Sequence, residues 1–521
     1  MIPLPEKILY KEGSFVINSK TQIFFDDELE EIVDFFIEFI LNSTDKILER
    51  TSSKKDKECI IFEIDQTLSQ LESEGYLLIV TIDFVRLTAT SPHGIFNGLQ
   101  SLRQLLPPEC EKISFNKNTE WKIPCIKIED KPRFKWRGVM LDVSRHYQEI
   151  KTIKHLLDLM GLMKMNVFHW HLTDDQGWRI DIKKYPKLTE KGSKRKDSKI
   201  VKHIGKKYRG KPHQGFYTRE DILEIVRYAQ ERFITVIPEI EMPGHATAAI
   251  ASHPELSCRK EILDVAIKPG IFSNIFCAGQ EETFRFLEDV LEEVIFLFPS
   301  EIIHIGGDEV PKRRWKECSQ CQRRMKNENI DEVQSLHHYF TDRIASFLKS
   351  KGIITMGWNE ILHNKIDRNV IIHWWKMNKK QVMTHIQEGG NVVVSRFFRY
   401  YLDYNYIVTP LKKTYAFEPV PKDLDEKYYT NILGVEATIW TEWIPTIERL
   451  EWQVFPRLSA IAETGWSLRE RRNYKDFRGR LSRFSKRLDF LGVQYAPLEE
   501  VDPSNWYRFW HLRNAFKWPK I

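Results

Sequence analysis

Cysteine is scarce in this chain, with seven residues among 521. A small and odd number of cysteines argues against a fold held together by disulfides. Long hydrophobic runs are also absent, because no segment approaches the roughly 18 uninterrupted apolar residues of a membrane-spanning helix. The first residues, Met1–Lys7, lack the basic and apolar regions of a signal peptide. We therefore expect no membrane span and a cytoplasmic location, with secretion as the alternative if the sequence is a processed mature form.

Several functional signatures are missing too. The sequence has no Gly-rich phosphate-binding loop, no nucleophile elbow and no internal repeat. Its composition of 42% hydrophobic and 29% charged residues is that of an ordinary folded globular protein. Aromatic residues make up 12%, and their faces suit both large cores and stacking on sugar rings.

Positive charge is concentrated in one place. The net charge is +6, but residues 191–213 contain ten Lys or Arg and a single acid, so the rest of the chain is slightly acidic. A uniformly basic face for nucleic acid is therefore not expected. Such a run is usually a solvated surface loop. The alternative hypothesis is that this basic loop rims a binding site and attracts acidic ligands.

Residues 1–130 are predicted to form a smaller α+β accessory domain. Segments 76–83 and 84–90 alternate apolar and polar residues, as half-buried antiparallel strands do. Residues 95–106 have the apolar spacing of an amphipathic helix. The turn-rich stretch 124–132 then separates this unit from the rest of the chain.

From residue 131 to about 490, short apolar runs alternate with helical patterns, which predicts a (β/α)₈ TIM barrel. The eight candidate strands are 137–142, 166–171, 234–239, 302–306, 353–357, 370–374, 391–395 and 433–440. Residues 491–521 are predicted to form a C-terminal helical tail, because Trp506, Phe509, Trp510 and Phe516 fall near helical spacing. We expect this helix to pack on the barrel, with a dimer contact as the alternative.

Acidic and aromatic residues recur after these strands, where the active site of a barrel lies. They are Asp142, Arg145, His146, Asp174, Asp175, Glu239, Glu241, His245, Asp308, Glu309, Trp358, Glu360, Trp374, Trp375, Tyr401, Asp403, Trp440 and Glu442. Their repeated placement predicts one polar, aromatic-walled pocket. Because neighbouring residues on a strand face opposite sides, only one of Trp374 and Trp375 is expected to face it.

The sharpest local signal is the adjacent carboxylate pair Asp308 and Glu309. Both can enter one pocket only where the strand ends, and Gly306 and Gly307 permit the irregular backbone that this requires. Two carboxyl groups held close together do not ionise equally easily, so one can donate a proton near neutral pH while the other stays anionic. Proton donation and stabilisation of positive charge are what cleavage of a glycosidic bond requires.

Metal binding is not predicted. Cys318 and Cys321 have the Cys-x-x-Cys spacing of a zinc site, but no second cysteine or histidine pair is evident, so a surface turn or a local disulfide is the preferred interpretation. His169 and His171 share one strand face and are expected to be buried and hydrogen-bonded. Neither a metal nor another cofactor is therefore expected.

Together these segments resemble glycoside hydrolase family 20, the β-N-acetylhexosaminidases. The matching motifs, in order, are Arg137–His146, His169–Asp175, Pro238–His245, His304–Glu309, Gly357–Glu360, Tyr401–Asp403 and Glu436–Glu442. The resemblance spans about residues 4–467 and includes the accessory domain. The basic loop is a departure on the pocket side. Cys258 and Cys277 bracket the loop after the third strand and could pair if the protein were exported, but the sequence leaves this open.

The resemblance implies retaining exo-hydrolysis, in which the acetamido oxygen of the substrate attacks the anomeric carbon and forms an oxazolinium intermediate. It implies that Glu309 is the general acid and base, that Asp308 orients the acetamido nitrogen and stabilises the intermediate, and that Tyr401 binds the acetamido oxygen. The implied pocket walls are Trp358, Trp375 and Trp440. Arg145, Asp403 and Glu442 are the residues expected to bind sugar hydroxyls, and Asp174 and His245 those expected to support Arg145 and Glu309.

The predicted partner is thus a glycan with a terminal β-linked GlcNAc or GalNAc. The motifs leave open which of the two sugars is preferred, the linkage, and the oligomeric state. Two other functions stay open: a hydrolase that releases a disaccharide, like a lacto-N-biosidase, and a carbohydrate-binding protein on an inactive hydrolase scaffold.

Overall fold

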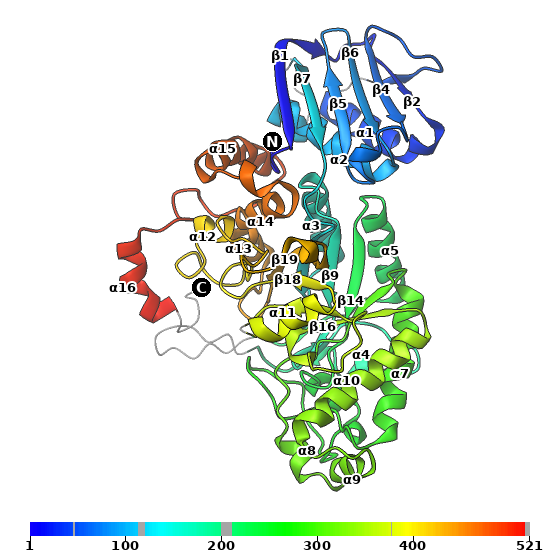
Figure 1. Ribbon diagram of the computed structural model, residues 1–521, viewed down its shortest axis with the longest axis vertical. Coiled ribbons are helices and arrows are strands. Elements are labelled where there is room, and N and C mark those ends of the chain that lie inside the picture. Colours follow the sequence, from blue (N-terminus) through cyan, green and yellow to red (C-terminus); the bar gives the residue numbers. More distant parts are fainter. Residues whose placement is uncertain (45–46, 113–119, 199–210, 377, 516–521) are drawn as a thin grey trace.

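The computed structural model describes residues 1–44, 47–112, 120–198, 211–376 and 378–515, and its N-terminal part is a single seven-stranded sheet with two helices (Figure 1). The strand order is β1-β7-β5-β6-β4-β2-β3. The strands are β1 (Lys7–Val16), β2 (Gln22–Phe25), β3 (Glu49–Arg50), β4 (Cys59–Ile64), β5 (Tyr76–Val80), β6 (Phe84–Ala89) and β7 (Lys122–Asp130). The predicted alternation is present in β5, whose residues are alternately buried and partly exposed.

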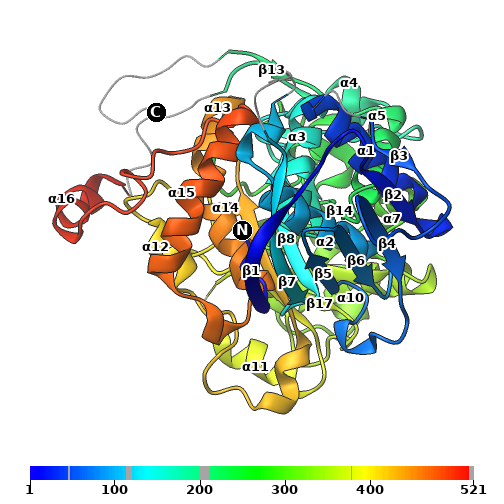
Figure 2. The same ribbon diagram turned by 90° about the horizontal axis from the view of Figure 1, so that it is seen from above.

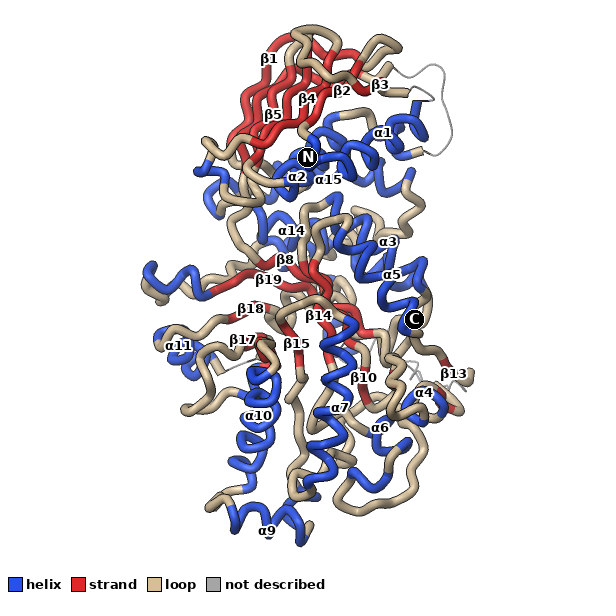
Figure 3. The backbone as a smooth tube through the Cα atoms, turned by 90° about the vertical axis from the view of Figure 1, so that its right-hand side faces the viewer, coloured by secondary structure: helices blue, strands red, loops and turns tan. Residues whose placement is uncertain are grey.

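Helices α1 (Glu30–Thr44) and α2 (Pro92–Leu105) lie between this sheet and the rest of the molecule (Figure 3). Helix α2 begins three residues earlier than the apolar spacing predicted. Pro92 occupies its first turn, and the Ser91 side chain accepts a hydrogen bond from the backbone N–H of Gly94. This cap satisfies a donor that the helix itself leaves free, and proline is well suited to the first turn.

The second unit is a closed barrel of eight parallel strands, as predicted. The strands are β8 (Trp136–Asp142), β9 (Val167–His171), β14 (Thr235–Glu239), β15 (Ile302–His304), β16 (Ile354–Trp358), β17 (Ile371–Trp374), β18 (Val392–Val394) and β19 (Ile432–Ile439). Every residue of β8 and β9 is buried, because helices cover the outside of the barrel and side chains fill its interior.

The helices that alternate with the strands are α3 (Ile150–Leu162), α5 (Arg219–Gln230), α7 (Glu281–Leu297), α10 (Val333–Ser350), α11 (Lys379–Gln387), α12 (Leu411–Tyr415), α13 (Ile447–Val454) and α14 (Arg457–Trp466). The connection between β16 and β17 departs from the pattern, because it holds the 3₁₀ turn η5 (Asn359–Ile361) where the others hold α-helices. Smaller elements in the loops are β10 (Thr173–Asp174), β11 (Gly177–Trp178), β12 (Lys194–Arg195), β13 (His213–Gln214), α4 (Lys187–Glu190), α6 (Thr247–Ser252), α8 (Arg313–Glu317) and α9 (Ser319–Asn327).

After the barrel, α15 (Tyr474–Phe490) lies beside α14, next to the N-terminal unit (Figure 2). Arg480 of α15 is paired with Glu463 of α14 at 2.6 Å. The predicted tail helix is present as α16 (Asn505–Ala515), but the expected packing of its aromatic residues on the barrel is wrong. Trp506 and Phe509 are 72% and 71% exposed. Phe516 lies outside the described residues. No helix among the described residues is long and apolar enough to cross a membrane.

The two units are joined by a buried polar cluster around Asp130, the last residue of β7. Its carboxylate accepts hydrogen bonds from the Tyr76 hydroxyl at 2.6 Å, the Lys164 ammonium at 3.0 Å and the Trp466 indole at 2.9 Å. Tyr76 belongs to the N-terminal sheet, whereas Lys164 and Trp466 belong to the barrel. The side chains of Asp130 and Lys164 are almost completely buried, so the two charges neutralise each other across the domain boundary.

We predict that Asp130→Ala lowers the free energy of unfolding by about 3–5 kcal/mol, because it leaves the buried Lys164 charge without a partner. Urea unfolding followed by circular dichroism measures this. The neighbouring Glu129 provides a matched control: it pairs with Lys7 at 2.6 Å, but Lys7 is exposed and Glu129 is partly exposed, so Glu129→Ala should cost at most about 1 kcal/mol. Equal losses in the two variants would contradict the role given to Asp130.

Candidate active site

The carboxylate pair lies in an irregular loop directly after β15. The φ angles of Gly306 and Gly307 are 65° and 91°, and that of Glu309 is 49°. A Cβ atom at Gly306 would lie 1.8 Å from a carboxylate oxygen of Glu241. Glycine is therefore required here by both its conformation and the available space, as the sequence indicated.

The carboxyl group of Glu309 is partly open to solvent, whereas that of Asp308 is more enclosed. Their side chains are 30% and 12% exposed. Burial and the adjacent Asp308 charge raise the pKa of Glu309. A carboxyl group with a raised pKa keeps its proton closer to neutral pH, which is what a proton donor requires.

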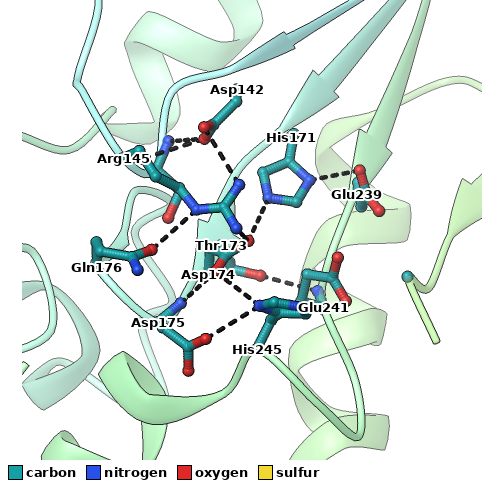
Figure 4. Close-up of polar contacts among 12 residues, drawn as sticks. Asp142, Arg145, His171, Thr173, Asp174, Asp175, Gln176, Glu239, Glu241 and His245 are labelled. Carbon is teal, nitrogen blue, oxygen red and sulfur yellow. Dashed lines mark hydrogen bonds and ion pairs between the residues drawn. The ribbon is translucent and has the colours of Figure 1, made fainter. Parts of the chain in front are cut away.

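His245 links this carboxylate pair to the loop after β9. Its Nε2 atom lies 3.7 Å from Asp308 Oδ2 and 3.8 Å from Glu309 Oε2. Its Nδ1 atom lies 3.2 Å from Asp174 Oδ1 and 3.0 Å from Asp175 Oδ2, and Figure 4 shows these two contacts. Burial lowers the pKa of His245, but the surrounding carboxylates outweigh burial and raise it well above its usual value. His245 is therefore a cation held among four acids.

Arg145 is fixed by three side chains at the ends of β8 and β9 (Figure 4). It donates to Asp174 at 2.7 Å, to Gln176 at 2.8 Å and to Asp142 at 3.3 Å. Burial raises the pKa of Asp174, but the Arg145 and His245 cations outweigh burial and hold it well below its usual range. Asp174 thus connects Arg145 to His245, its expected partner in supporting Arg145 and Glu309.

Aromatic side chains form one side of the same region. Trp375 stacks against Tyr401 with ring centroids 5.9 Å apart and an interplanar angle of 22°. Trp440 lies 5.7 Å from Trp358 and 6.3 Å from Tyr401, measured between ring centroids. Its ring is also 5.1 Å from the guanidinium carbon of Arg145. Of the tryptophan pair, Trp374 packs into an apolar cluster with Ile372 and Val394, so Trp375 is the one that joins these rings.

Several buried polar atoms in this region have no hydrogen-bond partner among the described residues. They are Asp308 Oδ1, Asp403 Oδ1 and Trp440 Nε1, together with both carboxylate oxygens of Glu241. An unpaired buried polar group costs about 1–3 kcal/mol, so such atoms are expected where a polar ligand binds. Burial and the nearby Glu442 charge raise the pKa of Asp403 well above its usual value.

A carboxylate beneath the pocket, Glu239, was listed among the residues that follow the strands, but the sequence assigned it no role. It lies at the end of β14 and receives contacts from His169 at 3.0 Å, His171 at 2.5 Å, His304 at 2.8 Å and Trp358 at 2.8 Å. These four partners come from β9, β15 and β16. His169 and His171 are buried and hydrogen-bonded, as expected. The Nδ1 atom of His169 lies 2.7 Å from Oε1 of Glu436 in β19.

Asp175 and Glu241 were likewise listed after the strands without a role, and Gln176 was not named from the sequence at all. The adjacency of Asp174 and Asp175 was the only signal for Asp175, which bonds both His245 and the backbone N–H of Thr247. Nothing in the local sequence distinguishes Gln176 from a surface glutamine. Glu241 is buried, and burial and the Asp308 charge raise its pKa well above its usual value.

The basic loop borders the site at its described ends. Strand β12 pairs with β13 and holds Arg195, which donates to the backbone oxygen of Gln176 at 3.1 Å. Arg195 also lines a small cavity that contains Arg145 and Glu442. The central part of the loop, residues 199–210, lies outside the described residues, so the hypothesis about acidic ligands stays a prediction.

Three features at the carboxyl end of the (β/α)₈ barrel define a glycoside hydrolase site. They are an acidic pair beside a cationic histidine, an arginine fixed by carboxylates, and a wall of indole rings. The profile described as glycosyl hydrolase family 20, catalytic domain, matches residues 134–469, and that of domain 2 of the family matches residues 1–131. The chain belongs to glycosyl hydrolase family 20.

Comparisons with individual proteins and solved structures agree with this family assignment. The chain is 38% identical to a β-hexosaminidase of Porphyromonas gingivalis in an alignment 521 positions long, which covers 96% of this chain and 65% of that protein. The chain thus spans about two thirds of the length of that relative. A solved structure of the family 20 β-N-acetylhexosaminidase of Streptomyces coelicolor matches with a TM-score of 0.83 and 30% identity, covering 96% of this chain and 98% of that one. The exo-β-N-acetylglucosaminidase of Vibrio harveyi in complex with N-acetylglucosamine gives 0.83 and 30%, covering 95% of this chain and 78% of that one.

We predict that Glu239→Gln lowers the free energy of unfolding by about 3–5 kcal/mol near neutral pH, because it removes the charge that neutralises buried histidines. Although burial lowers them, the pKa values of His169 and His171 are raised to about 9 and about 10 by Glu436, Glu239 and Asp174. Their stabilising contribution is therefore complete below their unfolded pKa of about 6.5 and is lost as pH rises through the folded values. The difference between wild type and variant should narrow between pH 7 and 10.

Glu255 offers a control, since it pairs with His253 at 3.0 Å but its side chain is 60% exposed. Glu255→Gln should change the free energy of unfolding by no more than about 1 kcal/mol. Urea titrations at several pH values measure both variants. A Glu239→Gln variant as stable as wild type would show that the histidines do not depend on this carboxylate.

Proposed function

We propose that this protein is an exo-acting, retaining β-N-acetylhexosaminidase that removes terminal β-linked GlcNAc or GalNAc by substrate-assisted catalysis. The observation that carries the proposal is the pair of Asp308 and Glu309 at the barrel mouth, beside the stacked rings of Trp375 and Tyr401. The names of the similar proteins support the same activity, and the N-acetylglucosamine in the Vibrio harveyi structure supports the sugar class.

In this proposal Glu309 protonates the glycosidic oxygen as the bond to the anomeric carbon breaks. The acetamido oxygen of the same sugar attacks that carbon and forms a cyclic oxazolinium ion. Glu309, now ionised, then takes a proton from the water that opens the ring, so the product keeps the β configuration. The raised pKa of Glu309 supports its first role, and its contact with His245 supports its return to the ionised state.

Asp308 is proposed to accept the acetamido N–H and to stabilise the positive charge that develops on the amide. Its unpartnered Oδ1 is available for this contact. A neutral amide is a weak nucleophile, so a fixed carboxylate beside its N–H lowers the barrier as charge develops. The Tyr401 hydroxyl is proposed to donate to the acetamido oxygen, and the rings of Trp358, Trp375 and Trp440 to enclose the acetamido group. An intramolecular attack from a confined geometry is worth up to about 7–11 kcal/mol.

The sugar hydroxyls are assigned to Arg145, Asp403 and Glu442. Arg145 has already formed its ion pair with Asp174, so binding a sugar does not require it to reorganise. Asp403 has an unpartnered oxygen, and burial raises the pKa of Glu442 although Arg145 opposes this. A hydrogen bond from a sugar would satisfy the buried Asp403 oxygen and so favour the bound state.

The proposed function is tested by initial rates on three aryl β-glycosides: the N-acetylglucosaminide, the N-acetylgalactosaminide and the glucoside. Hydrolysis of one or both acetamido sugars without hydrolysis of the glucoside is expected, because the glucoside lacks the attacking group. The ratio of the two rates gives the preference at C4. Silence on all three substrates from folded protein would favour a disaccharide-releasing enzyme or a binding protein.

Substrates with different leaving groups distinguish the roles of Glu309 and Asp308. Glu309→Gln should lower kcat roughly 10²–10⁴-fold on chitobiose but much less on a 2,4-dinitrophenyl glycoside, whose leaving group needs no proton. Wild-type activity on chitobiose should fall as pH rises through the raised pKa of Glu309. The activity of the variant on the dinitrophenyl glycoside should not show this fall at alkaline pH.

Asp308→Asn should reduce kcat on both substrates, since its role does not involve the leaving group. Glu292→Gln, on the outer face of α7 and half exposed, serves as a carboxylate control and should retain full activity. A Glu309→Gln defect of equal size on both substrates would remove Glu309 from the role of general acid.

A further inference from the structure

Four cysteines from two loops come together beyond the carboxyl ends of β14 and β15. Cys258 and Cys277 lie in the long loop between β14 and α7, whereas Cys318 directly precedes α9 and Cys321 lies within it. Helices α8 and α9 are at the end of the molecule farthest from the N-terminal unit (Figure 1, Figure 3). The four Sγ atoms all lie within 4.8 Å of one another. The sequence interpretation that Cys318 and Cys321 have no second cysteine pair is therefore wrong, because folding supplies Cys258 and Cys277.

The distances between the sulfur atoms distinguish a metal site from disulfides. Sγ of Cys277 lies 3.6 Å from that of Cys321 and 3.8 Å from that of Cys318, and Cys258 lies 3.8 Å from Cys321. A disulfide requires about 2.05 Å, and all seven cysteines are unpaired thiols. With a Zn–S distance of about 2.3 Å, the sulfurs at the corners of a tetrahedron are about 3.8 Å apart. Neither the Cys258–Cys277 pair nor the Cys318–Cys321 pair considered from the sequence is formed.

The surroundings of the cluster suit a buried, closed metal site. Cys277 and Cys321 are completely buried and Cys318 nearly so. A zinc ion with four thiolates carries a net charge of −2. Lys260, Lys316 and Arg323 flank the cysteines in sequence, as do Arg259 and Arg324, which pair with Glu317 and Glu281. Four thiolate ligands without an open position are typical of structural zinc, in contrast to the three ligands and water of a catalytic zinc.

We propose that Cys258, Cys277, Cys318 and Cys321 bind one Zn²⁺ ion in a tetrahedral Cys₄ site that ties the loop after β14 to the loop after β15. Binding displaces the thiol protons to solvent as each sulfur becomes a ligand. The site is separate from the carbohydrate pocket, and the proposal does not depend on the proposed hydrolase activity.

The two loops that the zinc would join also carry the proposed catalytic groups. His245 lies at the start of the first loop, and Asp308 and Glu309 at the start of the second. The loops are packed closely at the cysteines: a Cβ atom at Gly279 would lie 2.3 Å from the backbone nitrogen of Cys321, and the Trp315 indole donates to the backbone oxygen of Phe276 at 2.9 Å. The zinc would therefore fix the second loop relative to His245 from outside the pocket.

The test is the metal content of the full-length protein, purified under reducing conditions without a metal-affinity step. Mass spectrometry of the metal is expected to find one zinc per chain. The Cys318→Ser/Cys321→Ser double variant should lose it, whereas Cys59→Ser/Cys125→Ser, which removes two buried cysteines of the N-terminal sheet, should keep it. Retention of zinc in the first double variant would overturn the proposal.

Two measurements on wild-type protein avoid the risk that a variant fails to fold. Titration of the thiols with p-hydroxymercuribenzoate should release one zinc to a chromogenic chelator, and thermal unfolding should shift to lower temperature after that release. Replacement by Co²⁺ should give the visible absorption of tetrahedral cobalt thiolate. Metal-free protein with intact thiols, a mass lowered by disulfide formation, or iron in place of zinc would each overturn the assignment.

Discussion

The carboxylate of Glu239 is the constraint on which the catalytic end of the barrel depends. It is completely buried, and it is contacted by His169, His171, His304 and Trp358, which come from three other strands. Burial raises its pKa, but the surrounding histidines outweigh burial and hold it well below its usual value. A charge in such a place is tolerated only if it is neutralised and hydrogen-bonded. The strand ends are thus held in register by a polar network, and the pocket lies directly above it.

Above this network, the pocket keeps charges in arrangements that are costly without a ligand. Cations alternate with acids from Arg145 through Asp174 to His245, and this chain of contacts ends at Asp308 and Glu309. Each fixed pair orients the next side chain, so the groups proposed to meet the sugar are preorganised. Unlike the paired groups, Asp308 and Asp403 each have an oxygen without a hydrogen-bond partner among the described residues. Unpaired buried atoms at a functional site lower the stability of the fold, and favourable contacts elsewhere are expected to compensate for this.

The outer contacts stabilise the pocket from two sides. At one end of the barrel, Asp130 joins Lys164 and Trp466 to the N-terminal sheet, so the segment that leads into β9 is anchored to that sheet. At the other end, the loops after β14 and β15 pack against each other at Gly279 and Trp315. The proposed zinc ion would join these two loops through its bonds to the four cysteine sulfurs. The loops that carry the proposed catalytic groups depend on such contacts, because loops are more mobile than the strands and helices that they connect.

The sequence by itself determined the barrel, the strand ends and the loop that holds Asp308 and Glu309. Apolar runs, their spacing and a Gly-Gly pair are local signals, and local backbone preferences decide where a strand ends. Tertiary structure alone decided which distant residues meet. Glu239, Gln176 and the Cys258–Cys277 pair carry no local mark of their partners, because those partners lie tens of residues away and are brought together only by barrel closure and loop packing. The aromatic spacing in α16 likewise indicated a helix but not its exposure, since periodicity reports which face is apolar and not what covers it.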